Sequence, residues 1–275
     1  MMRYIKLVNF EINRFSKIYL SLLLITLVSQ FAGVIIVTKS LLNDARDIMK
    51  EERLSEAAYI ANYGGIDFNH IANSLLFVGP IALSAVALIF YIFLIWYRDW
   101  FGKNTFIYRL LMLPTSRLSI YLSKATSIFL MVLGLIAFQI IILPMENALF
   151  NSNVPQVLLS EMSISTITIA NPILSLIIPS TFTQFLISYG TGLMIMSILF
   201  TAIMFERSFR IKGIIMGLLY CGIAAVLFLA PVLMEIGNFY FYPNELFGLM
   251  LAIGIILTGL SVWLGAWLLK NRVTV

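Results

Sequence analysis

The sequence predicts an all-α polytopic membrane protein with six transmembrane helices and both termini on the cytoplasmic side. Of the 275 residues, 61% are hydrophobic and only 11% are charged, whereas soluble domains carry about 25% charged residues. The apolar residues gather into blocks of about 20, the length at which a helix crosses the hydrocarbon core. Because these blocks are apolar on all sides and do not alternate, they favour helices over the strands of a membrane barrel.

We expect one transmembrane domain over residues 1–275, with a short helix ahead of the first span. Residues 1–17 mix apolar and basic side chains and predict an amphipathic helix on the cytoplasmic surface, with a generic basic flank as the alternative. The spans are expected at about 18–37, 75–97, 119–143, 181–205, 213–234 and 246–269. The first block could instead be a secretory signal, but it lacks a convincing small-residue cleavage site and is therefore interpreted as a retained span.

Basic residues set the orientation, because the cytoplasmic flanks of spans are enriched in Lys and Arg. Fourteen of the 18 Lys and Arg residues lie on one side of the six-span layout, and the other four lie in the loop 38–74. The four exceptions are Lys39, Arg46, Lys50 and Arg53. Acids divide the other way, since only Glu11, Asp99 and Glu206 lie on the basic side. The basic side is therefore expected to be cytoplasmic, and it includes both termini.

Two long outer loops are expected, at 38–74 and 144–180. The first is rich in helix formers and predicts an outward extension of the first helix that breaks at Gly64-Gly65. The second contains an apolar stretch, 164–178, that is interrupted by proline and too short to span alone. Such a stretch predicts a re-entrant or interfacial element, which must pack against protein to satisfy its backbone.

The sequence shows no catalytic or metal site. The only ionisable residue inside a predicted span is Lys124, close enough to the helix end for its ammonium to reach the interface. The single histidine, His70, has no second His or Cys near it to complete a zinc site. The one Gly-Lys pair is followed by Asn104 and lacks the rest of a phosphate loop, so any ATP must bind another chain. Basic residues form no continuous stripe, which argues against a nucleic-acid partner.

Uncharged polar side chains within the spans admit two interpretations. They can form hydrogen bonds between helices, which is the default, or line a path for an amphipathic substrate. The candidates for such a path are Gln30, Gln139, Gln184, Ser188 and Tyr189. A Gly-x-x-x-Gly pair, Gly213 and Gly217, allows close helix packing either within the monomer or in a dimer.

The cytoplasmic connection 98–118 is the most distinctive segment. Apolar residues at helical spacing, Phe106, Ile107, Leu110, Leu111 and Leu113, end at Pro114. They predict a short amphipathic helix that does not span. Lipid headgroups and a partner protein are both candidates for the surface it lies against.

This connection resembles that of type-2 ATP-binding-cassette (ABC) exporter permeases. The likeness rests on an Arg, then a Gly, then an apolar stretch ending in Leu113-Pro114-Thr115-Ser116-Arg117, with a Lys seven residues later. The segment around Glu11 and Arg14 is similar to the N-terminal surface helix of that family. In that family the Gly is usually followed directly by Thr or Ser. In this sequence Lys103 and Asn104 lie between Gly102 and Thr105.

The resemblance implies a permease that dimerises with a second permease chain and pairs with cytosolic ABC ATPase subunits, which bind ATP and Mg²⁺. Residues implied in coupling to the ATPase are Arg98, Gly102, Phe106, Arg109, Leu113, Pro114 and Arg117, supported by Glu11 and Arg14. For these bases, anchoring to membrane lipid is the alternative.

The expected function is export of a hydrophobic or amphipathic substrate from a bacterial cell. The Ile-, Lys- and Asn-rich composition and the segment Leu113-Pro114-Thr115-Ser116-Arg117 are similar to those of permeases of Gram-positive bacteria that export, or confer resistance to, antimicrobial peptides. The chain itself is expected to be no enzyme and to bind no cofactor. The alternatives are a membrane sensor or scaffold whose outer loop binds a ligand and, less favoured, an intramembrane enzyme.

Overall fold

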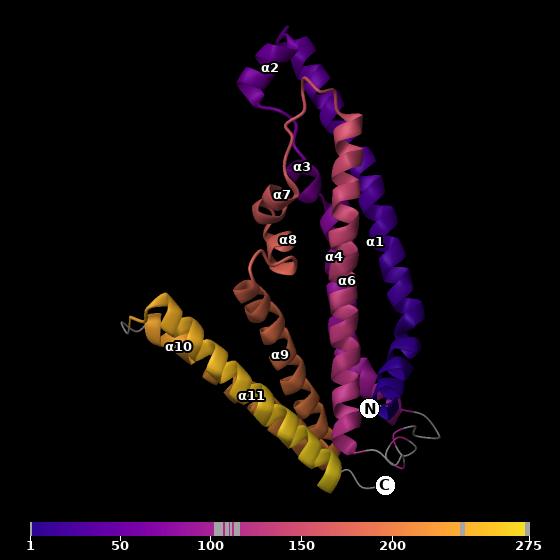
Figure 1. Cartoon of the computed structure of the whole chain (residues 1–275), viewed down its shortest axis with the longest axis vertical. Coiled ribbons are helices and arrows are strands. Elements are labelled where there is room, and N and C mark those ends of the chain that lie inside the picture. The colour runs from indigo at the N-terminus through magenta and orange to yellow at the C-terminus, as the bar shows by residue number, and fades with distance from the viewer. Residues whose placement is uncertain are drawn as a thin grey trace. The chain divides into compact units, whose positions relative to one another are not determined.

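The computed structural model describes residues 2–101, 107, 110, 112, 116–236 and 240–272 (Figure 1). The helices are α1 (Met2–Glu51), α2 (Glu56–Tyr63), α3 (Asn69–Ala72), α4 (Leu75–Trp100), α6 (Arg117–Asn153), α7 (Ile164–Ala170), α8 (Pro172–Ile177), α9 (Phe182–Phe209), α10 (Ile211–Ile236) and α11 (Pro243–Asn271). Six of them, α1, α4, α6, α9, α10 and α11, are long and apolar enough to cross a membrane. The prediction of an all-helical fold with six helices that are long and apolar enough to span a membrane is thereby confirmed for the described residues.

Two long helices run past the limits that the sequence suggested. Helix α1 continues through residues 17 and 18, where we expected the chain to turn from a surface helix into the first span. Helix α6 continues through Pro144 as far as Asn153, whereas the sequence predicts a loop that begins at Pro144. Proline is tolerated inside spanning helices because neighbouring groups satisfy the carbonyl that it leaves without a donor.

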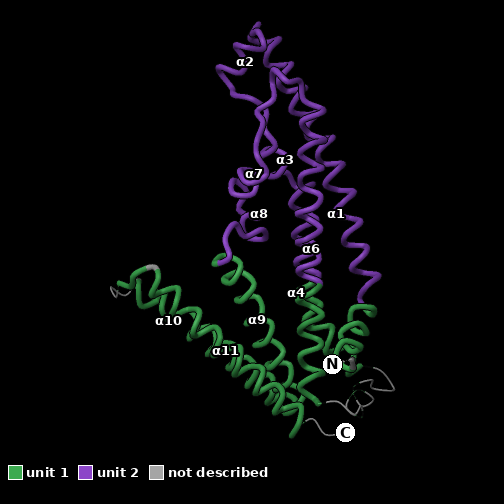
Figure 2. The backbone as a smooth tube through the Cα atoms, viewed as in Figure 1, with its two compact units in different colours: residues 1–14, 88–130, 183–275 green, residues 15–87, 131–182 purple. Residues whose placement is uncertain are grey.

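The chain forms two compact units (Figure 2). Unit 1 comprises residues 1–14, 88–130 and 183–275, and unit 2 comprises residues 15–87 and 131–182.

Unit 2 contains both long connections, and they bind each other. Helix α1 does extend beyond the predicted first span, but it ends at Glu51 and not at Gly64-Gly65, because the chain first breaks at Arg53, whose φ of 54° is left-handed. Ser55 then caps α2, which ends at Gly64 with φ 82°, so the predicted break at Gly64-Gly65 is the second one. Beyond it, Ile66 exchanges backbone hydrogen bonds with the other connection, donating to Leu158 at 2.8 Å and accepting from Ser160 at 2.9 Å.

The apolar stretch 164–178 forms the pair of short helices α7 and α8, packed against protein as expected. Asn171 joins them: its side-chain oxygen caps α8 by accepting from the backbone N–H groups of Ile173 and Leu174, and its amide donates to the carbonyl of Ala72 at 2.9 Å. Asn171 is buried, so this one amide satisfies a helix end and ties the two connections together.

Unit 1 has an aromatic core and a tight α9–α10 hairpin. Trp96 of α4, Tyr121 of α6 and Phe200 of α9 are fully buried and in mutual ring contact. The hairpin turns at Arg210, with φ 54°. A Cβ on Gly213 would lie 2.0 Å from the Phe205 carbonyl oxygen. The small residue at this position therefore lets α10 fold back against α9 in the same chain.

Candidate functional site

A cluster of five charged side chains lies within unit 1, where the start of α1, the end of α4 and the start of α6 meet. Its members are Glu11, Arg14, Arg98, Asp99 and Lys124. Arg98 is one of the coupling residues expected from the sequence, and Glu11 and Arg14 are the expected supporting residues. Neither Asp99 nor Lys124 is among the site residues expected from the sequence. We call this group the charge cluster.

Lys124 is the centre of the charge cluster. Its ammonium donates to Asp99 Oδ2 at 2.5 Å, to Glu11 Oε1 at 2.7 Å and to the Ile95 carbonyl at 2.9 Å. The side chains of Lys124 and Asp99 are 0% exposed, and that of Glu11 is 3% exposed. The expectation that the Lys124 ammonium reaches the interface is wrong, because two carboxylates and a carbonyl already supply all three of its acceptors.

Two arginines complete the charge cluster from its rim. Arg14 donates to Asp99 Oδ1 at 2.6 Å and lies 3.9 Å from Glu11. Arg98 donates to Glu11 Oε2 at 3.1 Å. Each carboxylate therefore contacts Lys124 with one oxygen and an arginine with the other.

The buried charges of the cluster are stabilised by pairing with one another and not by water. Burying an ion without a partner costs several kcal/mol, and breaking a buried pair typically costs about 3–5 kcal/mol. Asp99 and Lys124 are both fully enclosed, so each is the counter-ion that offsets the cost of burying the other. The pairs fix the relative positions of the ends of α1, α4 and α6 that carry them.

A second charged group joins the end of α4 to α9. The Tyr97 hydroxyl donates to Glu206. The Arg207 guanidinium lies over the rings of Tyr97, at 4.6 Å from the centroid, and Trp100, at 5.5 Å. Stacking of a guanidinium on aromatic faces is favourable and directional. The residues at which the connection 98–118 begins are thus held by α9 as well as by the charge cluster.

Of the described residues in the connection 98–118, Ile107, Leu110 and Arg117 contact the chain itself, whereas Phe101 and Met112 are exposed. Ile107 is fully buried, and Leu110 packs in one apolar cluster with Leu7 of α1 and Ile120 of α6. At the far end of the connection, Arg117 donates to the carbonyls of Leu269 and Lys270 in α11. The apolar face predicted from helical spacing is therefore at least partly an internal face.

The predicted coupling residues divide into two groups. Arg98 and Arg117 lie at the two ends of the connection and are both bonded to other helices. Gly102, Phe106, Arg109, Leu113 and Pro114 lie outside the described residues. The supporting pair Glu11 and Arg14 belongs to the charge cluster.

The predicted substrate-path residues also fall into two groups. In unit 2 the Gln30 amide donates to Gln139 Oε1 at 3.2 Å, and both side chains are buried. In unit 1, Gln184, Ser188 and Tyr189 follow one another along α9 and are half-buried. In this structure the two glutamines face each other, which is the interhelical bonding that we expected by default.

Unit 2 holds further buried polar atoms that the sequence analysis did not single out. Glu146, two turns beyond Gln139 on α6, is fully buried. Both of its carboxylate oxygens lack a hydrogen-bond partner among the described residues, and the same is true of Gln30 Oε1 and Gln139 Nε2. Buried polar atoms of this kind are uncommon and mark places where water or a ligand can bind.

The described residues contain no cluster of metal-ligating side chains. No group of three or more His, Cys, Asp or Glu side chains is placed there to hold an ion. His70 lies 3.8 Å from Asp67 on the exposed surface of unit 2.

Comparison with known proteins does not identify the chain. No family model, no curated protein and no solved structure matches it.

Proposed function

We propose that the chain is the membrane-spanning permease subunit of an ATP-driven ABC exporter in a bacterial cell membrane. In this proposal the basic side of the chain and both termini face the cytoplasm. Cytosolic ATPase subunits bind ATP and Mg²⁺ and dock on the connection 98–118, and a second permease chain completes the transporter. The cargo is a hydrophobic or amphipathic molecule, with an antimicrobial peptide as the leading candidate, and resistance to that peptide is the biological outcome.

The observation that carries the proposal is the way in which the connection 98–118 is anchored. Its first residues are bonded to α1 and α6 through the charge cluster. Leu110 in its middle packs against Leu7 and Ile120, and Arg117 at its end is bonded to α11. A displacement applied to this connection by a partner would therefore act on several spanning helices at once, as coupling requires.

The pairing within the charge cluster supports a substrate without a fixed charge requirement. The five charged groups of the charge cluster are bonded to one another, whereas ion-coupled transporters keep ionisable groups available along the path. The sequence has no recognisable phosphate loop, so in this proposal the energy for transport comes from ATP hydrolysis by another chain.

The test is purification of the chain from its native membrane with any phosphate-loop ATPase that accompanies it. We expect a stable complex that hydrolyses ATP. Charge reversal at Arg109 or Arg117 should weaken its assembly or its ATP hydrolysis, because both are proposed to form or orient the contact.

A matched control is Lys6→Glu, which reverses an exposed base on α1 on the same basic side. The control should leave the complex intact, so that loss in both variants would indicate a general charge effect. Full assembly and transport after deletion of residues 102–113 would refute the coupling proposal.

A second candidate function is a membrane sensor whose connection 38–74 binds a ligand. It is favoured by the order of that connection, which is paired with residues 158–160 through Ile66 and tied down by Asn171. A sensor needs no ATPase, so a chain that purifies without one from its native membrane, and responds to a ligand, would favour this alternative.

A further inference from the structure

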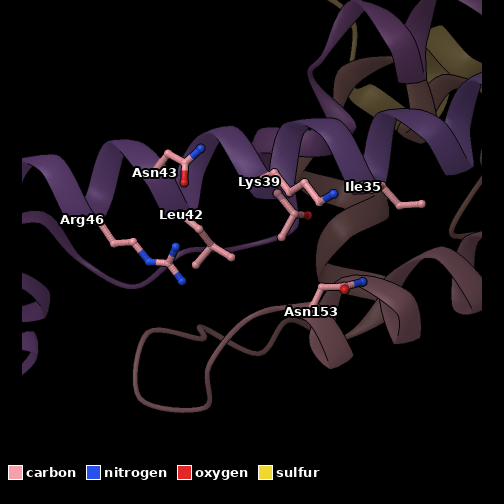
Figure 3. A pocket seen from close by; sticks show the side chains of 7 residues that line it. Ile35, Lys39, Leu42, Asn43, Arg46 and Asn153 are labelled. Atoms are coloured by element: carbon pink, nitrogen blue, oxygen red, sulfur yellow. The ribbon is translucent and has the colours of Figure 1, made fainter.

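A pocket of about 380 Å³ lies in unit 2, between one face of α1 and the end of α6 (Figure 3). Six of its lining residues follow one another at helical spacing along α1, and the seventh comes from α6. They are Ile35, Thr38, Lys39, Leu42, Asn43, Arg46 and Asn153. We call this the α1 pocket.

The polar groups of the α1 pocket are suited to an anion. Lys39 and Arg46 supply cationic donors, and Asn43 supplies amide N–H groups. Asn153 donates one amide N–H to the Leu149 carbonyl at 2.7 Å and has a second one for a ligand. No acidic residue is among the described residues that line it. The acid next to Arg46 in sequence, Asp47, pairs instead with Lys50 at 3.8 Å.

Thr38 adds a donor without a partner. Its side chain is 1% exposed, and its hydroxyl forms no hydrogen bond with any described residue. A buried hydroxyl usually has a partner, because leaving it without one costs about 1–3 kcal/mol. The Thr38 hydroxyl thus keeps an unused donor beside the pocket that this residue lines, although its oxygen is not exposed at the pocket surface.

Lys39 and Arg46 are also two of the four bases that break the charge rule of the rest of the chain. Nearly all other Lys and Arg residues lie on the opposite side of the predicted layout. Enrichment of bases on one side is the usual pattern for membrane proteins, so bases on the other side need a reason of their own. A bound anion supplies such a reason for the two that line the pocket.

In the predicted six-span layout, the α1 pocket falls at the edge of the hydrocarbon layer, at the depth of a lipid phosphate group. The uncharged helix between Lys17 and Lys39 rises about 33 Å at 1.5 Å per residue, close to the thickness of about 30 Å of the hydrocarbon core. Lys39 therefore stands at the edge of that layer. Ile35, at the inner end of the pocket, is 43% exposed and offers apolar surface to the part of a ligand that lies in the membrane.

We infer that the α1 pocket binds the phosphate group of an anionic membrane amphiphile, such as an anionic phospholipid. The phosphate lies against Lys39 and Arg46 and accepts hydrogen bonds from the amides. The acyl part extends along Ile35 into the hydrocarbon layer. This site is separate from the charge cluster and does not depend on the proposed export function.

The test is lipid binding to the full-length protein in detergent, measured by native mass spectrometry. The probes are a phosphatidylglycerol and a phosphatidylcholine with the same acyl chains, together with inorganic phosphate. The variant is the double substitution Lys39→Gln with Arg46→Gln. Its matched control, Lys50→Gln with Arg53→Gln, removes the same charge from the same segment but leaves the pocket lining unchanged.

We expect the unmodified protein and the control to bind phosphatidylglycerol in preference to phosphatidylcholine. The Lys39 and Arg46 double variant should bind phosphatidylglycerol at least tenfold more weakly, because two charge-assisted contacts are lost. Thermal unfolding followed by circular dichroism checks that both double variants fold. Asn153→Ala, which leaves the charge unchanged, should also weaken binding.

Three results would overturn the inference. Equal loss of binding in the two double variants would mean that lipid follows overall charge and not the pocket. Equal binding of the two phospholipids would exclude a preference for an anion. Displacement of the lipid by inorganic phosphate at comparable concentration would identify a soluble phosphate as the ligand and exclude the amphiphile.

Discussion

Neutralising Asp99 tests whether the charge cluster is a single coupled unit. The isosteric substitution Asp99→Asn removes one negative charge from a fully buried position that contacts Lys124 at 2.5 Å and Arg14 at 2.6 Å. Three cations then face one carboxylate, and the Lys124 ammonium keeps only Glu11 as a counter-ion. We expect the free energy of unfolding to fall by about 3 kcal/mol, the lower end of the range for breaking a buried pair.

The double variant Asp99→Asn with Lys124→Met separates pairing from simple loss of contacts. It removes both fully enclosed charges and leaves Glu11 with Arg14 and Arg98, which are 22% and 29% exposed and can reach solvent. The double variant should therefore be less destabilised than the sum of the two single variants, by about 2 kcal/mol.

Unfolding of the purified protein in mixed micelles, with increasing dodecyl sulfate, provides the measurement. Trp96 lies 5.1 Å from the Lys124 ammonium, so tryptophan fluorescence reports on this region, and circular dichroism reports on the whole helix content. Additive losses in the two single variants and the double variant would refute the coupling of the cluster.

Three other substitutions test packing and hydrogen bonding elsewhere. Gly217→Leu should lower the free energy of unfolding by about 1–3 kcal/mol, since a Cβ at this position already lies 3.0 Å from the Ala202 carbonyl oxygen; an unchanged unfolding midpoint would argue against the α9–α10 contact. Asn171→Leu removes a helix cap worth about 1 kcal/mol together with a buried bond to the other connection, and faster proteolysis within residues 154–181 should reveal it. Gln139→Leu should cost about 1 kcal/mol or less, because Gln30 loses one of its two acceptors; equilibrium unfolding against the Gln139→Glu variant measures the difference.

The spanning helices could be predicted from the sequence because each is defined by its own residues. A block of about 20 apolar side chains needs no distant partner to make it a membrane helix. The limits of the helices were less predictable. Pro144 signals a break in isolation, but α6 continues through it to Asn153.

The charge cluster could not be predicted as a cluster, although its members carried a signal. Glu11 and Asp99 are two of only three acids on the basic side of the layout, and both pair with Lys124 in the structure. Near a helix end, a lysine can either extend its ammonium to water or bury it against acids. The choice depends on residues far away in sequence, and periodicity within one helix contains no information about them.

The Gly213 and Gly217 pair illustrates an alternative that the structure decides. From spacing alone, close packing within one chain and packing between two chains are equivalent. In the structure Gly213 lies against the Phe205 carbonyl and Gly217 against Ala202, both on α9. The contact is therefore made within the chain.

The pairing of Lys124 with two earlier residues has a consequence for biosynthesis. Glu11 and Asp99 precede Lys124 in the chain, so both carboxylates leave the ribosome before the ammonium does. A lysine placed deep in an inserting helix costs about 2.5–3.5 kcal/mol at the bilayer centre and less toward the ends. Because α1 and α4 deliver its counter-ions first, we expect α6 to meet them as it enters the membrane, so that the order of residues along the chain eases its insertion.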